Sequence, residues 1–140
     1  MSFFLDTNIL VYQFDDTHPA KQKRARDLVR EALTIGSGMC STQVVNEFCN
    51  LALRRFAVPM SAVDCGMYVD SVLAPLCTVG WSHSLVREAL RIVERWQAAW
   101  YDALIIAAAI EGGAGTLYSE DLQDGMRFGS VQVRNPFADR

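Results

Sequence analysis

The feature that most constrains the fold is an alternation of short apolar runs with longer helical patterns. Apolar runs at residues 3–5, 39–41, 76–79, 116–118 and 131–133 have the length of buried strands. Residues 19–33, 42–56, 61–73 and 82–96 place apolar side chains at steps of three or four, and residues 100–111 are apolar on nearly every face. Strands that alternate with helices of this length need crossover connections. We therefore predict a three-layer α/β/α fold with a mostly parallel central sheet of about five strands.

Length and composition predict one folded domain over residues 1–140. Hydrophobic residues make up 51% of the chain and charged residues 21%, which is typical of a globular protein rather than a disordered one. The net charge is −3 and the pI is near 5.3. This balance argues against a broad phosphate-neutralising surface of the kind that drives nonspecific nucleic-acid binding. If nucleic acid is a partner, something other than overall charge must attract it.

The cysteines and the apolar segments indicate a cytoplasmic protein. The four cysteines include no C-x-x-C pair and the chain has only two histidines, so neither a zinc site nor a redox pair is predicted. The apolar run before Asp6 is too short for the core of a signal peptide. The longest apolar stretch, residues 103–110, is well short of the ~20 residues that span a bilayer. We expect a cytoplasmic location and no membrane association.

Acidic residues recur just after the predicted strands. Asp6 follows the first strand, Glu47 lies in the first turns of the helix after the second, and Asp102 opens the helix over residues 100–111. Asp121 follows the fourth strand, with Asp124 three residues further on. Ligands of open α/β sheets bind beyond the carboxyl ends of the strands. The sequence therefore predicts a cluster of carboxylates at one edge of the sheet.

Two of these acids stand where a carboxylate is unusual. Glu47 comes three residues after Val44 and four before Leu51, so helical periodicity places it within the apolar stripe of its helix. Asp102 lies at the start of a helix that is otherwise apolar all round, where the helix dipole favours an anion. Both positions indicate that these carboxylates have a partner.

A divalent cation is the partner that such a cluster predicts. Carboxylates brought together in a poorly solvated cleft repel one another, and a cation reverses the sign of that interaction. Mg²⁺ and Mn²⁺ prefer hard oxygen ligands, which suits a site without His or Cys. A bound metal can activate water for attack on a phosphodiester and can attract phosphate to an acidic protein. The predicted cofactor is therefore Mg²⁺ or Mn²⁺.

Ordered motifs along the chain carry a family resemblance. The segments are LDTNIL at residues 5–10, VNEF at 45–48, WYDALI at 100–105, YSEDLQDG at 118–125 and NPF at 135–137. Each motif alone is weak, whereas their conjunction in this order is specific. The chain resembles PIN-domain proteins over essentially its whole length. In particular it is similar to the VapC-type ribonuclease toxins of bacterial type II toxin–antitoxin systems.

The resemblance implies an activity and its partners. It implies a Mg²⁺- or Mn²⁺-dependent endoribonuclease that hydrolyses RNA with metal-activated water, forms a homodimer and is blocked by a cognate antitoxin. Asp6, Glu47, Asp102 and Asp121 match the family's catalytic and metal-binding acids. The small polar positions that orient ligands or water are matched by Thr7, Asn8 and Ser119. Whether Asp121 or Asp124 is the fourth ligand stays open, with Asp121 favoured.

Two other functions compete with this one. In an aspartate-dependent phosphatase or phosphotransferase, Asp6 would be the nucleophile, but the D-x-D-x-T pattern of haloacid dehalogenases has an Asp where this chain has Asn8. In a non-catalytic partner-binding module of the same fold, the acids would be residual. The presence of an acid at all four matched positions disfavours that second alternative.

Other residues have a structural interpretation beside a functional one. Arg54 and Arg55 follow Glu47 by about two helical turns and are candidate RNA contacts, but arginine at a helix end also favours the dipole. The basic series over residues 21–30 is interpreted as a solvated face. The three tryptophans, Trp81, Trp96 and Trp100, are interpreted as core or interface anchors rather than as platforms for bases. The helix over residues 61–73, together with the start of the next helix, is the candidate dimer surface.

Overall fold

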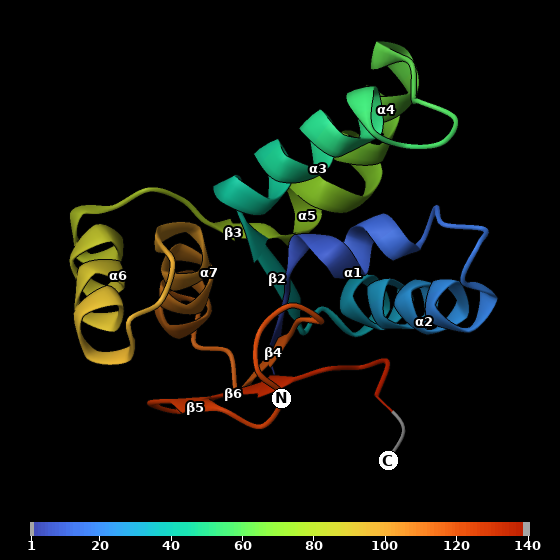
Figure 1. Ribbon diagram of the computed structural model, residues 1–140. Coiled ribbons are helices and arrows are strands. Elements are labelled where there is room, and N and C mark those ends of the chain that lie inside the picture. The colour runs from blue at the N-terminus through green and yellow to red at the C-terminus, as the bar shows by residue number, and fades with distance from the viewer. Residues whose placement is uncertain (1, 139–140) are drawn as a thin grey trace.

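Six strands form one sheet in the order β3-β2-β1-β4-β6-β5 (Figure 1). The computed structural model describes residues 2–138. The strands are β1 Phe3–Leu5, β2 Gly38–Ser41, β3 Cys77–Val79, β4 Thr116–Tyr118, β5 Arg127–Phe128 and β6 Val131–Arg134. All neighbouring strands are parallel except β5 and β6, which are antiparallel. The predicted α/β class and the mostly parallel sheet are confirmed.

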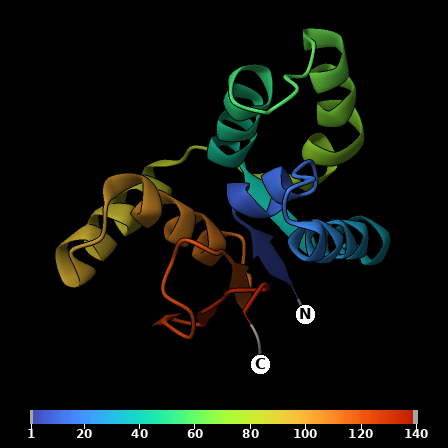
Figure 2. The ribbon, with the colours of Figure 1, turned by 45° about the vertical axis from the view of Figure 1, so that its right-hand side comes forward.

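Helices cover the sheet on both sides. The helical elements are α1 Thr7–Tyr12, α2 Pro19–Ile35, α3 Thr42–Arg54, α4 Ala62–Tyr68, the π-helix η1 Val69–Leu73, α5 Ala74–Leu76, α6 His83–Trp96 and α7 Trp100–Glu111. Figures 1 and 2 show α6 and α7 on one side of the sheet, α1 and α2 on the other, and α3 with α4 extending beyond it. None of the helices over residues 2–138 is long and apolar enough to span a bilayer.

Local chemistry explains where several helices begin and end. The Ser82 hydroxyl accepts a hydrogen bond from the backbone N–H of Leu85 at 3.0 Å, which caps α6 as its sequence predicts. Ser61 caps α4 in the same way through the N–H of Asp64. At the other end of α2, Gly36 adopts a φ of 75°, a left-handed conformation that glycine adopts without steric cost.

The buried core places the chemistry at the end of β1. Phe4 and Leu5 of β1 and Leu117 of β4 are fully buried, and α7 packs an almost wholly apolar surface against the sheet. From β1 the chain builds outward through β2 and β3, and it later returns to the other side of β1 as β4 and β6. The residue after β1 therefore stands where the strand order reverses, the usual ligand position of such sheets. That residue is Asp6.

The structure contains elements that the sequence patterns did not predict. Helix α1 begins directly after Asp6, in a segment left without regular structure in the prediction. Strand β5 lies inside the predicted polar loop over residues 119–129 and extends the sheet by one short antiparallel strand. Helix α2 ends two residues after its predicted end, and helix α3 ends two residues before its own predicted end.

The prediction that the helix starting near Ser61 ends before Pro75 was wrong. Helical structure continues from α4 through η1 and α5 to Leu76, so β3 begins at Cys77 rather than at Leu76. In η1 the hydrogen bonds run five residues back, as from the Ala74 N–H to the Val69 carbonyl. This wider turn precedes Pro75, which stands in the first turn of α5, where a proline without an N–H is tolerated.

Candidate active site

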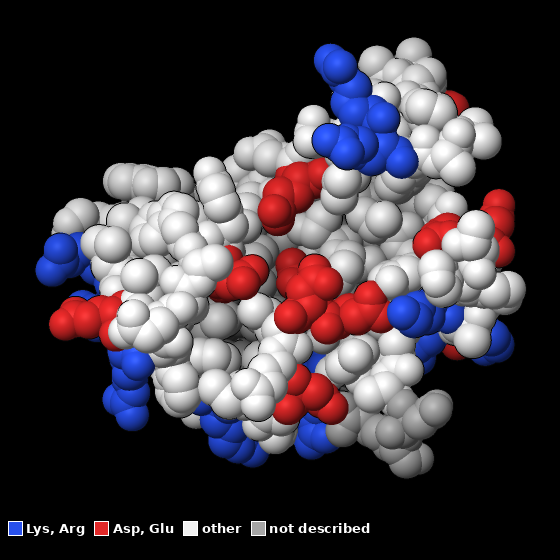
Figure 3. Space-filling model, in the orientation of Figure 1, with Lys and Arg blue, Asp and Glu red and all other residues white. Residues whose placement is uncertain are grey.

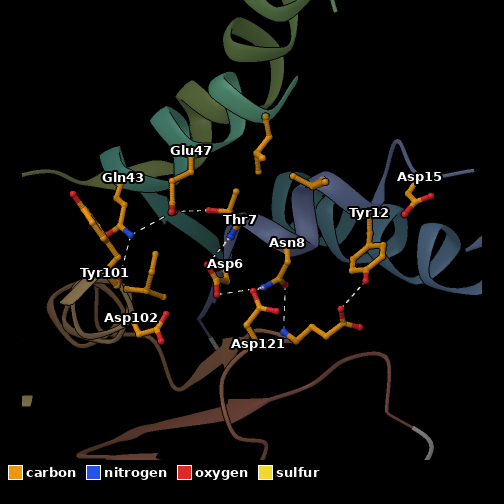
Figure 4. A pocket seen from close by; sticks show the side chains of 14 residues that line it. Asp6, Thr7, Asn8, Tyr12, Asp15, Gln43, Glu47, Tyr101, Asp102 and Asp121 are labelled. Carbon is orange, nitrogen blue, oxygen red and sulfur yellow. Dashed lines mark hydrogen bonds between the residues drawn. The ribbon is translucent and has the colours of Figure 1, made fainter. Parts of the chain in front are cut away.

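The carboxyl edge of the sheet is hollowed by an acidic cavity of about 410 Å³. Its lining includes all four acids that the sequence singles out: Asp6, Glu47, Asp102 and Asp121. They come from the end of β1, from α3, from the first turn of α7 and from the loop after β4. Figure 3 shows acidic atoms gathered at the centre of this face, and Figure 4 shows the carboxylates arranged around the cavity. The structure thus brings together residues that are up to 115 positions apart in sequence.

Asp6 is the most buried acid of the cavity, with 9% of its surface exposed. It caps α1, because its Oδ1 accepts the backbone N–H of Thr7 at 2.7 Å. Its Oδ2 accepts the Ser119 hydroxyl at 2.8 Å and, more weakly, the Asn8 amide at 3.4 Å. These donors come from the first turn of α1 and from the residue after β4, and they fix the carboxylate in one orientation.

Burial raises the pKa of Asp6 from its ordinary value of 3.8 to about 6. The hydrogen bonds from Ser119 and Thr7 oppose this rise, whereas the negative charges of Glu47 and Asp121 add to it. Loss of water is thus the main cause, and repulsion between acids is a smaller one. A cation beside Asp6 would favour its ionised form.

Thr7 and Gln43 hold Glu47. The Thr7 hydroxyl donates to Glu47 Oε1 at 2.9 Å, and the Gln43 amide approaches the same oxygen at 3.4 Å. Gln43 also donates to the backbone carbonyl of Tyr101 at 3.2 Å, which ties α3 to the start of α7. Glu47 is half-buried, so it occupies the edge of the apolar stripe with polar partners, as its position predicted.

Asn8 positions the loop that carries Asp121. Its amide nitrogen donates to Asp121 Oδ2 at 3.1 Å, and its Oδ1 accepts the backbone N–H of Glu120 at 3.2 Å. Asp124 is outside the lining of the cavity, and its Oδ1 accepts the backbone N–H of Asn135 at 2.9 Å. This placement favours Asp121 over Asp124 as the fourth acid of the site.

Asp102 is exposed, as is Asp121, but it has fewer partners. It lies in the first turn of α7, next to Tyr101, whose side chain is 67% exposed at the rim of the cavity. Among the described residues, Asp102 has no hydrogen bond or ion pair with the other acids. Figure 4 shows its carboxylate directed into the cavity from the side opposite Asn8. Asp102 is therefore open to a ligand that enters from solvent.

One wall of the cavity was missed by the sequence analysis. Glu120 accepts the Tyr12 hydroxyl at 2.6 Å and pairs with Lys21 at 2.6 Å. The Lys21 ammonium also lies 4.9 Å from the centre of the Tyr12 ring. No local pattern marked Lys21 or Tyr12, because Lys21 belongs to a basic series that is otherwise solvated and Tyr12 lies on the unpredicted helix α1. The acidic character of Glu120 beside Asp121 was the only available signal.

Arg54 and Arg55 lie outside the cavity. They stand at the carboxyl end of α3, and neither lines the acidic cavity. Figure 3 shows a basic patch over that end of α3, above the acidic centre. Arg55 instead lines a separate hollow with Phe14, Phe56 and Val58. The structure therefore gives these arginines no contact with the acids, and their role in RNA binding stays a prediction.

The donor chemistry of the cavity fits a hard dication, but not a cage of protein ligands. All four acids offer carboxylate oxygens, which are the ligand type that Mg²⁺ and Mn²⁺ prefer. Within residues 2–138, no three acidic, His or Cys side chains stand close enough together to hold one ion. Mg²⁺ usually takes one or two carboxylates and keeps several waters. The residues thus fit a hydrated ion held by one or two acids at a time.

Comparison with known proteins places the chain in a family. A model of the PIN domain matches residues 3–123, and no relative was found among curated proteins. Three solved structures share the fold: a toxin–antitoxin complex from Klebsiella pneumoniae, VapC20 from Mycobacterium tuberculosis and VapBC2 from Rickettsia felis bound to promoter DNA. In the same order, the identities are 16%, 22% and 18%, and the TM-scores are 0.67, 0.63 and 0.64. The alignments cover 98%, 86% and 96% of this chain, and 98%, 90% and 98% of the other. The chain belongs to the PIN domain family.

Proposed function

We propose that this chain is a Mg²⁺- or Mn²⁺-dependent endoribonuclease, the toxin of a toxin–antitoxin pair. The observation that carries the proposal is the convergence of four carboxylates from four separate elements on one cavity, with Asp6 buried among them. Such an arrangement costs free energy in the absence of a cation, so it favours a site built to receive one. The M. tuberculosis relative is described as a toxin that cleaves the sarcin–ricin loop, which supports RNA as the substrate class.

The chain's own residues hold and orient the acids. Thr7 uses its backbone N–H on Asp6 and its hydroxyl on Glu47, so one residue fixes two carboxylates. Asn8 fixes Asp121, and Ser119 fixes the second oxygen of Asp6. One or two of Asp6, Glu47, Asp102 and Asp121 at a time would hold a hydrated metal ion. When bound, a dication supplies an activated water and stabilises negative charge on the phosphate and the leaving oxygen.

The contacts of Asp6 disfavour the phosphotransferase alternative. A nucleophilic aspartate must present an oxygen to phosphorus, but both oxygens of Asp6 accept short hydrogen bonds and the residue is 9% exposed. A metal ligand needs only one remaining lone pair. The alternative of a non-catalytic module is disfavoured because the polar residues that orient the acids are present as well.

Cleavage of RNA with and without metal tests the proposal. The native chain should cut an end-labelled RNA pool with Mg²⁺ or Mn²⁺ and not with EDTA, and Asp6→Asn should reduce the rate by at least about a hundredfold. Asp70→Asn is the matched control, because Asp70 is exposed on η1 and distant in sequence from the site. Comparing Asp121→Asn with Asp124→Asn decides between these two acids. Cleavage that persists in EDTA, or that survives Asp6→Asn, would refute the proposal.

The partners are part of the proposal and need separate tests. The relatives from K. pneumoniae and R. felis are a toxin–antitoxin complex and a VapBC assembly, which supports a cognate antitoxin for this chain. We expect the native chain to arrest growth when expressed alone and Asp6→Asn to be tolerated. Co-expression of the reading frame beside its gene should restore growth. Light scattering of the purified chain should show a homodimer, and a monomer at all concentrations would exclude it.

A further inference from the structure

A second hollow, distinct from the acidic cavity, lies between α6 and the β5–β6 hairpin. It has a volume of about 570 Å³ and shares no lining residue with the acidic cavity. Its lining is basic and aromatic, and includes Glu88, Arg91, Arg95, Trp96, Arg127 and Phe128. Figures 1 and 2 show α6 and β5 adjacent to one another at the same corner of the molecule in both views. We call this hollow the arginine groove.

The arginine groove is positive in a protein that is negative overall. Three arginines and one glutamate give it a local charge of +2, against −3 for the whole chain. Arg91 pairs with Glu88 at 2.7 Å. Among the described residues, Arg95 and Arg127 have no carboxylate within 4.0 Å. Two guanidinium groups are therefore available to an anionic ligand.

Trp96 presents a braced aromatic ring to the arginine groove. Trp96 is 40% exposed, so it is not a core residue, whereas its predicted use as an interface anchor is untested. The ring packs edge-on against the buried Phe128, with centroids 5.0 Å apart, and the Arg95 guanidinium lies 5.5 Å from its centre. These contacts hold the ring in place and leave part of its surface open for stacking.

We propose that the arginine groove binds a single-stranded segment of the RNA substrate that flanks the cleavage site. In this proposal Arg95 and Arg127 contact phosphates, and one base stacks on Trp96. The substrate class rests on the proposed function. The combination of two arginines with an exposed indole ring favours RNA over an acidic peptide. A peptide carboxylate would use the arginines and gain little from the open indole ring. A nucleic acid uses both, since each base offers a π-face to stack.

The two sites lie at opposite ends of α7. Tyr101 and Asp102 line the acidic cavity, whereas Ile110 lines the arginine groove. Nine residues of helix separate Tyr101 from Ile110, a rise of roughly 14 Å. A single strand long enough to bridge this rise can occupy both sites at once. The arginine groove would therefore add affinity for substrates that extend from the acidic cavity along α7.

Binding of a fluorescein-labelled 20-mer of uridylate in EDTA tests the proposal without any cleavage. In the absence of metal the acidic cavity repels phosphate, so fluorescence anisotropy reports the basic surfaces, and the groove variants isolate the share of the arginine groove. Arg127→Gln should weaken binding about fivefold at 0.1 M salt and reduce the slope of log affinity against log salt by about 0.7. Arg87→Gln, an exposed arginine of α6 outside the groove, should change affinity by less than twofold.

Substitution of Trp96 should change RNA binding in a different way from substitution of Arg127. Trp96→Leu should weaken binding at least about fivefold with no change in the salt slope, and Trp96→Phe should recover most of the loss. The effect of Trp96→Leu should vanish on an abasic 20-mer. Thermal unfolding of each variant identifies those that fold. If Trp96→Leu does not fold, Trp96→Phe keeps the test valid.

Several results would overturn the arginine groove as an RNA site. They are the absence of 20-mer binding in EDTA, an equal loss with Arg87→Gln, and a Trp96→Leu effect that persists on the abasic strand. Polyglutamate that binds as tightly as RNA and is indifferent to Trp96→Leu would assign the groove to a protein partner instead. Because this assay needs no metal, a chain that cleaves nothing can still bind RNA here. Failure of the nuclease proposal is therefore distinguishable from failure of this one.

Discussion

At the scale of single residues, Asp6 is where burial of charge in the acidic cavity costs the most free energy. Its carboxylate is shielded from water, oriented by Thr7 and Ser119, and exposed to the charges of Glu47 and Asp121. Burial is the largest of these effects and raises its pKa to about 6. The folded protein without metal therefore binds a proton at Asp6 more tightly than the unfolded chain does.

This raised pKa predicts how stability depends on pH in EDTA. Between about pH 4 and pH 6 the folded state keeps a proton at Asp6 that the unfolded chain releases, so Asp6 lowers the stability as pH rises through 6. Relative to Asp6→Asn, the native chain should lose on the order of 2–3 kcal/mol of unfolding free energy between pH 4 and pH 8. Urea denaturation across this range measures the difference.

The exposed Asp70→Asn provides the control for that titration. Its unfolding free energy should run parallel to that of the native chain at every pH. At pH 8 in EDTA, Asp6→Asn should unfold at a temperature a few degrees above that of the native chain. A variant Asp6→Asn that is less stable than the native chain at pH 8 would show that the hydrogen bonds of the carboxylate outweigh its burial.

Thr7 gives a second prediction at this scale. Thr7→Val removes the hydroxyl that holds Glu47 and leaves the backbone bond to Asp6 in place. We expect RNA cleavage to fall about tenfold, mainly in kcat, with a loss of stability near 1 kcal/mol. Thr7→Ser restores a hydroxyl and should recover most of the rate. Equal rates for the Val and Ser variants would show that the Thr7 hydroxyl does not position Glu47.

At the scale of elements, close packing of α2 on β2 sets the sheet edge that carries the site. A Cβ added at Gly38 would stand 2.1 Å from the Ala32 Cβ and 2.8 Å from its Cα, distances that no side-chain motion relieves. Because β2 leads directly into α3, which carries Glu47, a shift of β2 reaches the cavity. The absence of a side chain at Gly38 is therefore a structural requirement of the fold.

Substitution by alanine at two glycines tests this packing. Gly38→Ala should destabilise the protein by about 1–3 kcal/mol through overpacking. Gly66→Ala, in helix α4 with open space around its Cα, should raise stability by up to about 1 kcal/mol. Chemical denaturation measures both. Equal effects of the two substitutions would show that the contact of α2 with β2 is not tight in solution.

The elements that were predicted have strong local signals, and those that were missed do not. Helix α7 was predicted with its observed bounds because an uninterrupted apolar run ends at two glycines. Helix α1 has only six residues, and the D-T-N sequence at its start is equally typical of a turn. Strand β5 has two residues and exists because β6 offers it a pairing edge, which is a tertiary cause. Pairing of that kind has no period in the sequence.

The candidate site was likewise predicted only where local signals are strong. Glu47 and Asp102 were found because each stands in an apolar setting, and Asp6 and Asp121 because each follows a predicted strand within the ordered motifs. Their orienting contacts link residues that are far apart, such as Thr7 with Glu47 and Lys21 with Glu120, and no local pattern marks them. The exposure of Trp96 was also beyond the sequence, since it depends on the short β5 strand leaving part of the ring open.

At the scale of the whole molecule, charge is separated rather than balanced. The acids gather at the centre of one face and a basic patch lies over the end of α3 (Figure 3). Three more arginines line the arginine groove. A net charge of −3 would repel RNA if it were evenly spread. The separation allows RNA to bind by its flanks and makes its approach to the acids conditional on a cation.

Binding of Mn²⁺ is the measurement that tests the central claim most directly, because it depends on neither substrate nor antitoxin. Electron paramagnetic resonance of free Mn²⁺, titrated with protein at pH 7.5, gives the affinity of each variant. We predict saturable binding to the native chain and to Asp70→Asn, weakened at least tenfold by Asp6→Asn or by Asp102→Asn. Equal Mn²⁺ binding by all four proteins, or by none of them, would contradict a metal site in the acidic cavity.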